Sequence, residues 1–263
     1  MSACVAGLGL LGPGLPDWDR GRAILSGASD WHADTTLIPS LTCLPSAERR
    51  RTGVPVRIAL TAGLQACSHA GVDPATLPAV FTSSGGDGEN LHEICTALAA
   101  GERQLSPTRF HNSVHNAPSG YWSIATGATP ASNALCAHDA SFAAGLLEAL
   151  AQLHAEQRAV LLVAYDAPYP EPLRTVRPIP HAFAVALVLT LQPTPTALAR
   201  LEVAVGEAPP STLPSGGLEE LRARIPAARS LPMLAQIARA ESGTVVLDYL
   251  GTLTLSVKVR ACP

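Results

Sequence analysis

The segment RAVLLVAYDA, from Arg158 to Ala167, places the strongest constraint on the fold of this chain. Its apolar residues run without a break, so a strand formed here buries both of its faces. Strands of that kind lie inside sheets that helices cover on both sides, and this arrangement is typical of α/β proteins. Because only 15% of the chain is charged and 47% is apolar, much of it must be covered by itself or by a partner.

Strand and helix patterns alternate from residue 1 to residue 207. We expect a mixed sheet of about five strands with helices on both faces, in one domain over residues 1–207. After Pro209, a proline-rich linker, two short helices and an alternating strand pattern predict a small α+β extension over residues 208–263. Strands are expected near 4–11, 78–84, 129–135, 158–167, 181–191 and 199–208, and helices near 56–71, 89–101, 116–128 and 140–157.

Composition excludes several classes of protein. A net charge of −3 argues against a protein that binds nucleic acid or an anionic membrane. Apolar stretches end well before the ~18 residues of a membrane span. The N-terminus lacks the basic segment of a secretion signal, and the six cysteines form no CxxC pair. These features predict a reduced, cytoplasmic protein.

Two short motifs bear on cofactors and metals. Gly7, Gly9 and Gly12 match the GxGxxG pattern of dinucleotide-binding proteins. That site needs a helix at its third glycine, whereas Pro13 follows Gly12. His111 and His115 have a metal-binding spacing, but no carboxylate or cysteine nearby completes a site. We expect no cofactor and no metal.

The segment SNALCAHDASFAAGLLEAL, from Ser132 to Leu150, is the candidate for chemistry. A short extended run ends at Cys136, and His138 and Asp139 follow before a helix of small residues begins. A helix N-terminus offers unpaired backbone N–H groups and the positive end of the helix dipole, which favour the nucleophilic thiolate form of a cysteine. Cys136 is therefore one candidate nucleophile.

The order of these segments resembles the N-terminal half of a β-ketoacyl (acyl-carrier-protein) synthase, a condensing enzyme of the thiolase fold. PSAERRRTGVPVRIALTAGLQACSHAGVDP is similar to the family's helix with a charged start and an alanine-rich body. AVFTSSGGDGENL resembles its strand and Gly-rich turn, and NSVHNAPSGYWSIATGATP resembles the helix before the nucleophile strand. VLLVAYDA and AFAVALVLT fit the two following strands. The resemblance covers roughly residues 1 to 207 and implies a thiolase-like half.

The resemblance also assigns the nucleophile position. The alignment without gaps puts Asp139 there, whereas aligning Cys136 would change the length of a helix between two packed strands. We expect Asp139 to cap that helix, where a carboxylate is worth about 1 kcal/mol. The family has two catalytic histidines and a lysine in its C-terminal half, but here no histidine follows residue 207 and Lys258 is the only lysine there. The groups needed for decarboxylative condensation are therefore missing.

These features resemble accessory subunits of the chain-length-factor kind, which pair with a catalytic ketosynthase in polyketide or aryl-polyene assembly. The resemblance implies association through the edge strand before the nucleophile, because an edge with few charges favours pairing. Its residues are Ala131, Ser132, Asn133, Ala134 and Leu135. The implied acyl-tunnel residues are Phe110, Asn112, Val114, Asn116 and Trp122. The implied partners are a catalytic ketosynthase and an acyl carrier protein, with a homodimer as an alternative.

Two other functions stay open from the sequence. A small acyl transferase or hydrolase would use Cys136 as nucleophile with His138 or His115 as base. A stand-alone module that binds an acyl chain or a carrier protein would need no ketosynthase partner. A reactive thiol at Cys136 would favour the first function, and a homodimer formed without a ketosynthase would favour the second.

Overall fold

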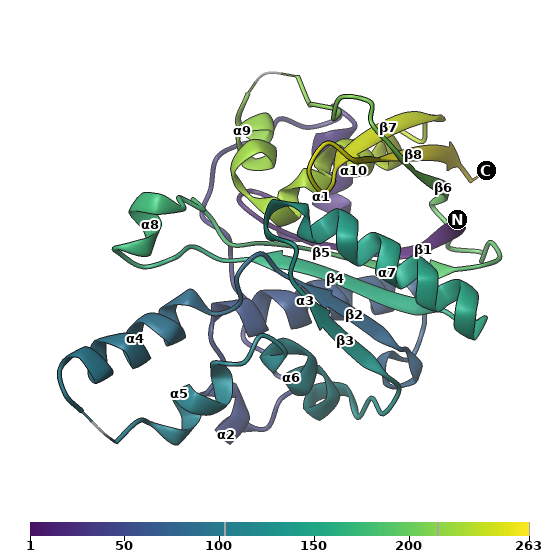
Figure 1. Cartoon of the computed structure of the whole chain (residues 1–263). Helices are drawn as coiled ribbons and strands as arrows, with labels where there is room; N and C mark the ends of the chain where they lie inside the picture. The colour runs from purple at the N-terminus through teal and green to yellow at the C-terminus, as the bar shows by residue number, and fades with distance from the viewer. Residues whose placement is uncertain (103, 215, 263) are drawn as a thin grey trace.

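The fold is taken from a computed structural model that describes residues 1–102, 104–214 and 216–262. In this part of the chain eight strands form one sheet, in the order β3-β2-β4-β5-β1-β6-β8-β7 (Figure 1). Strand β2 lies parallel to β3 and β4, and the other neighbouring pairs are antiparallel. The strands are β1 (Ser2–Leu11), β2 (Ala79–Thr82), β3 (Ser132–Leu135), β4 (Val160–Asp166), β5 (Phe183–Thr190), β6 (Ala199–Gly206), β7 (Gly243–Asp248) and β8 (Thr254–Ala261).

Helices lie on both faces of this sheet. The α-helices are α1 (Trp18–Leu25), α2 (Ser46–Arg49), α3 (Val54–Ala70), α4 (Gly88–Ala99), α5 (Pro107–Asn112), α6 (Ala117–Thr126), α7 (Ser141–Glu156), α8 (Leu173–Val176), α9 (Gly217–Arg224) and α10 (Leu231–Ala238). Three 3₁₀ turns are η1 (Pro74–Thr76), η2 (His138–Ala140) and η3 (Pro226–Ser230). Among the described residues, no helix is both long enough and apolar enough to cross a membrane.

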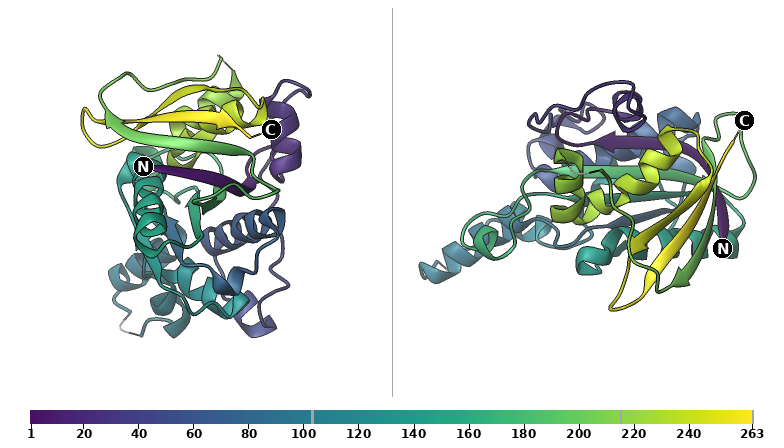
Figure 2. Two further views of the ribbon diagram at one scale, coloured as in Figure 1. Left: turned by 90° about the vertical axis from the view of Figure 1, so that its right-hand side faces the viewer. Right: turned by 90° about the horizontal axis from the view of Figure 1, so that it is seen from above.

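The α/β class predicted from the sequence is confirmed, but the sheet has eight strands where about five were expected. The difference lies at the C-terminal side, where β8 pairs with β6 along its whole length and β7 pairs with β8. Local alternation of apolar residues predicts that residues 253–259 form a strand, but it does not identify the neighbour of that strand. Figure 2 shows these last strands twisting away from the rest of the sheet while remaining continuous with it.

Strand β4 explains why the core has two parts. Side chains alternate between the two faces of a strand. Val160, Leu162 and Ala164 join the core under α7, together with residues of α10. Leu161 and Val163 join the core under α3 and α6. All the residues of β4 are buried, as its unbroken apolar run predicts.

The glycines of the GxGxxG motif allow helix α3 to lie directly on β1. A Cβ at Gly7 would collide with the carbonyl oxygen of Ala66, and one at Gly9 would collide with that of Ala62. After Gly12 the chain turns back, and Gly12 and Leu15 exchange two backbone hydrogen bonds of 2.8 and 3.0 Å. These glycines therefore have a packing role that accounts for the motif.

Candidate functional site at the turn between β3 and α7

The turn between β3 and α7 brings together the chemical groups that the sequence singled out. Its backbone is fixed by Ser141, whose hydroxyl accepts a 3.1 Å hydrogen bond from Ala137 N–H and donates a 2.7 Å bond to the His138 carbonyl. His138 has φ = 51°, a left-handed conformation that costs energy for residues other than glycine. Strained residues of this kind concentrate at functional turns.

Asp139 does not cap α7, contrary to the expectation from the sequence. The N-cap residue is Ala140, which makes no side-chain hydrogen bond to the helix. The Asp139 carboxylate instead accepts a 2.7 Å bond from Arg177 Nη2 and a 3.1 Å bond from Arg229 Nη2. The carboxylate is thus engaged by two guanidinium groups, whose fork of N–H donors matches its geometry, and not by the backbone N–H groups of the helix.

The arginines also determine the charge of Asp139. Burial alone would raise its pKa, but the hydrogen bond from Arg177 and the positive charges of Arg229 and Arg177 outweigh burial and hold the pKa below its ordinary value. Asp139 is therefore ionised at neutral pH, with both oxygens engaged. A carboxylate held in this way is a poor acyl acceptor.

A chain of ion pairs extends from Asp139 into the C-terminal segment. Arg229 of η3 also lies 3.6 Å from Asp248, at the end of β7. Asp248 lies 3.5 Å from Arg222 of α9, which pairs in turn with Glu219 at 2.7 Å. The turn after β3 is thus tied to segments about 80–110 residues away, and the sequence pattern alone gave no sign of these pairs.

Cys136 and the nearby histidines are separate from one another. The exposed Cys136 thiol donates to the Ser84 carbonyl at 3.3 Å. His138 Nε2 lies 2.7 Å from Arg177 Nη1, and because an arginine can only donate, this ring nitrogen is the acceptor. His115 Nε2 lies 3.3 Å from the Ser83 carbonyl. Within the described residues, neither imidazole hydrogen-bonds to Cys136, so the geometry lacks the thiol–imidazole pair that a cysteine nucleophile needs.

Asp166, at the end of β4, is a functional candidate that the sequence analysis missed. Its carboxylate is buried and accepts hydrogen bonds from Ser84 N–H at 2.9 Å, Ser84 Oγ at 2.5 Å and Ala227 N–H at 2.8 Å. Burial raises its pKa from an ordinary 3.8 to about 6, although these hydrogen bonds and Arg177 act in the opposite direction. An acidic residue that ends a strand buried on both faces is the signal that could have identified it.

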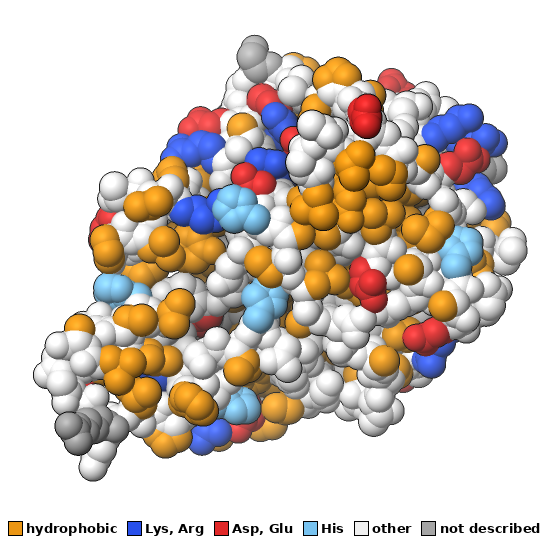
Figure 3. All heavy atoms as spheres, viewed as in Figure 1, with side chains coloured by type: hydrophobic (Ala, Val, Ile, Leu, Met, Phe, Trp, Pro, Cys, Tyr) orange, Lys and Arg blue, Asp and Glu red, His pale blue; other side chains and the backbone are white. Residues whose placement is uncertain are grey.

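The five expected tunnel residues fall into different environments. Asn112 is buried and donates to the Arg51 carbonyl at 2.7 Å while it accepts from Tyr121 Oη at 3.1 Å. Trp122 is also buried, edge-on to Phe81. The remaining three, Phe110, Val114 and Asn116, are exposed, and Phe110 leaves 68% of its surface uncovered. Figure 3 shows apolar side chains among the exposed atoms at this end of the molecule.

The residues expected at the subunit contact lie on one outer edge of the sheet. Ser132, Asn133, Ala134 and Leu135 form β3, Ala131 immediately precedes it, and Ala131 to Asn133 are exposed. In the described part of the chain β3 pairs only with β2. The opposite edge is hydrogen-bonded to a neighbouring segment at Val246 of β7, where Ser211 N–H donates to the Val246 carbonyl at 2.8 Å and Ser211 Oγ accepts from Val246 N–H at 3.0 Å.

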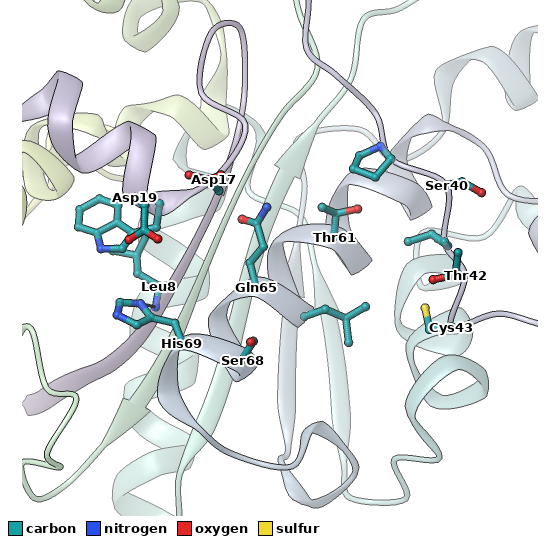
Figure 4. A pocket seen from close by; sticks show the side chains of 14 residues that line it. Leu8, Asp17, Asp19, Ser40, Thr42, Cys43, Thr61, Gln65, Ser68 and His69 are labelled. Atoms are coloured by element: carbon teal, nitrogen blue, oxygen red, sulfur yellow. Dashed lines mark hydrogen bonds between the residues drawn. The ribbon is translucent and has the colours of Figure 1, made fainter. Parts of the chain in front are cut away.

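Two larger pockets lie away from this turn. One, of about 520 Å³, lies between β1, α1 and α3 (Figure 4). There Gln65 Oε1 accepts from Leu10 N–H at 2.9 Å and His69 Nδ1 accepts from Leu8 N–H at 3.2 Å, because β6 pairs with β1 only as far as Val5. The other, of about 780 Å³, is lined by Arg50, Arg51, Arg57, Arg109, Asp87 and other residues. Among the described residues, no cluster of His, Cys, Asp and Glu could hold a metal ion.

The mixed sheet with helices on both faces matches solved ketosynthase structures, and the fold is thiolase-like. The model of the β-ketoacyl synthase N-terminal domain matches residues 24–241. The chain therefore belongs to the β-ketoacyl synthase family. A search of curated proteins finds no match.

Three solved structures illustrate the likeness. A structure described as a ketosynthase (ApeO) in complex with its chain length factor (ApeC), from Xenorhabdus doucetiae, matches with 25% identity and a TM-score of 0.75, over 98% of this chain and 99% of that chain. The ishigamide ketosynthase/chain length factor matches with 12% identity and a TM-score of 0.73, over 100% of both chains. A complex of a type II acyl-carrier protein with its ketosynthase, AntDE:AntF, matches with 12% identity and a TM-score of 0.75, over 99% of both chains. The last two matches support the fold alone.

Proposed function

We propose that this chain is a non-catalytic, ketosynthase-like subunit of the chain-length-factor kind. It pairs with a catalytic β-ketoacyl synthase and helps to shape that enzyme's acyl tunnel. The observation that carries the proposal is the state of Asp139, which stands at the expected nucleophile position with both carboxylate oxygens bound to arginines. A ketosynthase-family chain whose turn is closed in this way needs a partner to supply the nucleophile and the general base.

The open edge of the sheet supports the pairing. Strand β3 carries no charged residue, and among residues 1–102, 104–214 and 216–262 it pairs only with β2, which leaves its outward backbone groups unpaired. A strand of the partner subunit, added across this edge, would form hydrogen bonds with these groups. The likeness to one chain of a ketosynthase–chain length factor complex supports a ketosynthase as the partner.

The exposed apolar residues that precede α6 support a role in forming a tunnel. Phe110 and Val114 precede α6, which contacts β3. A partner across this edge would cover both side chains and place them at the shared boundary. The pocket lined by Arg50, Arg51, Arg57 and Arg109 also contains Asp87 and Glu89, and its remaining excess of positive charge would suit an acidic carrier protein in the same assembly.

Reconstitution with a candidate ketosynthase tests this proposal. The chain and the ketosynthase are expected to co-purify, and an acyl donor is expected to label the partner's cysteine and leave Cys136 unlabelled. Val114→Phe is expected to shorten the product, because a larger side chain at the boundary reduces the tunnel. Val205→Phe, at an exposed site on β6, is the matched control and leaves product length unchanged.

Three outcomes would contradict the proposal. Rapid alkylation and acyl loading of Cys136 would favour the acyl transferase or hydrolase. A stable homodimer that ignores every ketosynthase offered would favour the stand-alone binding module. An unchanged product length with Val114→Phe would contradict the tunnel role but not the pairing with a ketosynthase.

A further inference from the structure

Two arginines from distant parts of the chain converge on the turn between β3 and α7. Arg177 precedes β5, and Arg229 belongs to η3. Their guanidinium groups lie 2.7 and 3.1 Å from different oxygens of Asp139. The two arginine side chains are only 22% and 21% exposed, so neither charge is fully solvated.

Space and positive charge lie next to the Asp139 carboxylate. A pocket of about 230 Å³ adjoins the carboxylate and is lined by Arg177, Arg224 and Arg229 together with apolar residues such as Ile179. Nη1 of Arg177 lies 2.7 Å from His138 Nε2 and Nη1 of Arg229 lies 3.6 Å from Asp248, so both guanidinium groups have contacts that do not depend on Asp139. Guanidinium groups recognise carboxylates through several parallel N–H donors, and this arrangement provides them.

We propose that Arg177 and Arg229 form a carboxylate-binding site at this turn, and that Asp139 occupies the site from within the chain. The ligand class is a small carboxylate of the size of acetate or malonate, for which the Asp139 side chain is the internal substitute. While Asp139 is in place, acidic ligands are excluded. This inference goes beyond the proposed function, because it concerns the isolated chain and requires no partner.

The energetics predict what happens when the internal ligand is removed. Truncating Asp139 leaves two partly buried positive charges without their shared partner, which is destabilising. It also leaves a space where the carboxylate stood, next to the existing pocket. Because a cavity lined by donors favours a matching ligand, an added carboxylate should restore the lost interaction.

Asp139→Ala tests the inference in the full chain. Its unfolding temperature is expected to rise by about 3 °C at an acetate concentration tenfold above Kd, and to saturate. Sodium chloride at the same ionic strength measures the unspecific effect of salt, and malonate measures the tolerance for size. The wild type is expected to respond to acetate and chloride equally. Asp139→Ala combined with Arg229→Gln is expected to lose the saturable response.

The inference is overturned if acetate and chloride stabilise Asp139→Ala equally, or if the wild type binds acetate as the variant does. If the variant does not fold in buffer, its refolding yield replaces the unfolding temperature. Recovery in acetate but not in chloride then supports the site, and equal yields overturn it. Ketosynthase binding by the wild type is measured separately, so a failure here is distinguishable from a failure of the proposed function.

Discussion

Gly9 shows how a single residue sets the distance between two elements. Its missing side chain lets the α3 backbone rest on β1, and a Cβ there would meet the carbonyl oxygen of Ala62. Backbone atoms in a packed helix cannot move aside as a flexible side chain can. We therefore expect Gly9→Ala to lower the free energy of unfolding by about 1–3 kcal/mol, the usual cost of overpacking.

Chemical denaturation of Gly9→Ala and Gly120→Ala compares the unfolding free energy after an added methyl group at a crowded glycine and at an uncrowded one. Gly120 lies in α6 with open space around the position of an added Cβ. Gly120→Ala is expected to be neutral or to stabilise the chain by up to about 1 kcal/mol, because alanine favours helix. Equal effects of the two substitutions would contradict the packing role assigned to Gly9.

Asp166 makes stability depend on pH in an unusual direction. Burial raises its pKa from 3.8 in an exposed carboxyl to about 6 in the folded chain. The protonated form is therefore favoured by folding, and this contribution is complete below pH 4 and is lost as the pH rises through 6. A shift of that size corresponds to about 3 kcal/mol.

Urea unfolding of the wild type and of Asp166→Asn across pH 4–7 tests this assignment. The unfolding free energy of the wild type minus that of the variant is expected to fall as the pH rises from 4 to 6. Subtraction removes the contributions of other carboxylates that titrate in this range. A constant difference would mean that Asp166 ionises normally, and a wild-type advantage that grows with pH would mean that folding lowers its pKa; either result would contradict the assignment.

At the scale of elements, the two edges of the sheet differ in whether another segment of the chain hydrogen-bonds to them. The β7 edge is hydrogen-bonded to Ser211, and Pro209 and Pro210 precede that contact. Proline on an edge blocks further strand addition. The β3 edge has no such cover among the described residues. The fold therefore leaves one edge available for assembly.

Ala134→Pro is the sharpest change at that edge. The carbonyls of Ala131 and Leu135 accept hydrogen bonds from the β2 side of the sheet, so the alternate residues Ser132 and Ala134 direct their backbone groups outward. A proline at 134 removes one outward donor and no bond to β2. Sedimentation of the chain with a ketosynthase is expected to show at least tenfold weaker binding.

Ala134→Ser is the matched control, because it retains the backbone N–H. It is expected to bind the ketosynthase within twofold of the wild type. Equal affinities for the proline and serine variants would show that the β3 edge does not form the contact. Circular dichroism of each isolated variant verifies that the fold is retained.

The sequence predicted the elements better than their neighbours. Unbroken and alternating apolar runs identified β4, β5 and β8, because burial imposes a period on local residues. The pairing of β8 with β6 was not predictable, since a strand's partner is selected by packing over the whole domain. Position 139 lies in the turn between β3 and α7, but its two arginine partners are 38 and 90 residues away. No local pattern indicates such contacts.

At the scale of the whole molecule, the C-terminal segment closes the turn that carries Asp139. Arg229 and the ion pairs through Asp248 reach this turn from one side. On the other side of the turn, Asp166 accepts hydrogen bonds from both Ser84 and Ala227 and so connects their two segments. Together these contacts hold the ends of β2, β3 and β4 in one arrangement, with the β3 edge facing outward. The molecule thus combines a turn held by ion pairs with an open β3 edge, and the proposed function rests on this combination.

Hydrogen exchange of the β3 amides, measured with and without a catalytic ketosynthase, tests this account most directly. The outward N–H groups of Ser132 and Ala134 are expected to exchange rapidly in the free chain and at least tenfold more slowly in the mixture. The amides of β7, whose edge is already covered, are expected to change little. Unaltered exchange at Ser132 and Ala134 in a mixture that nonetheless forms a complex would contradict assembly across this edge.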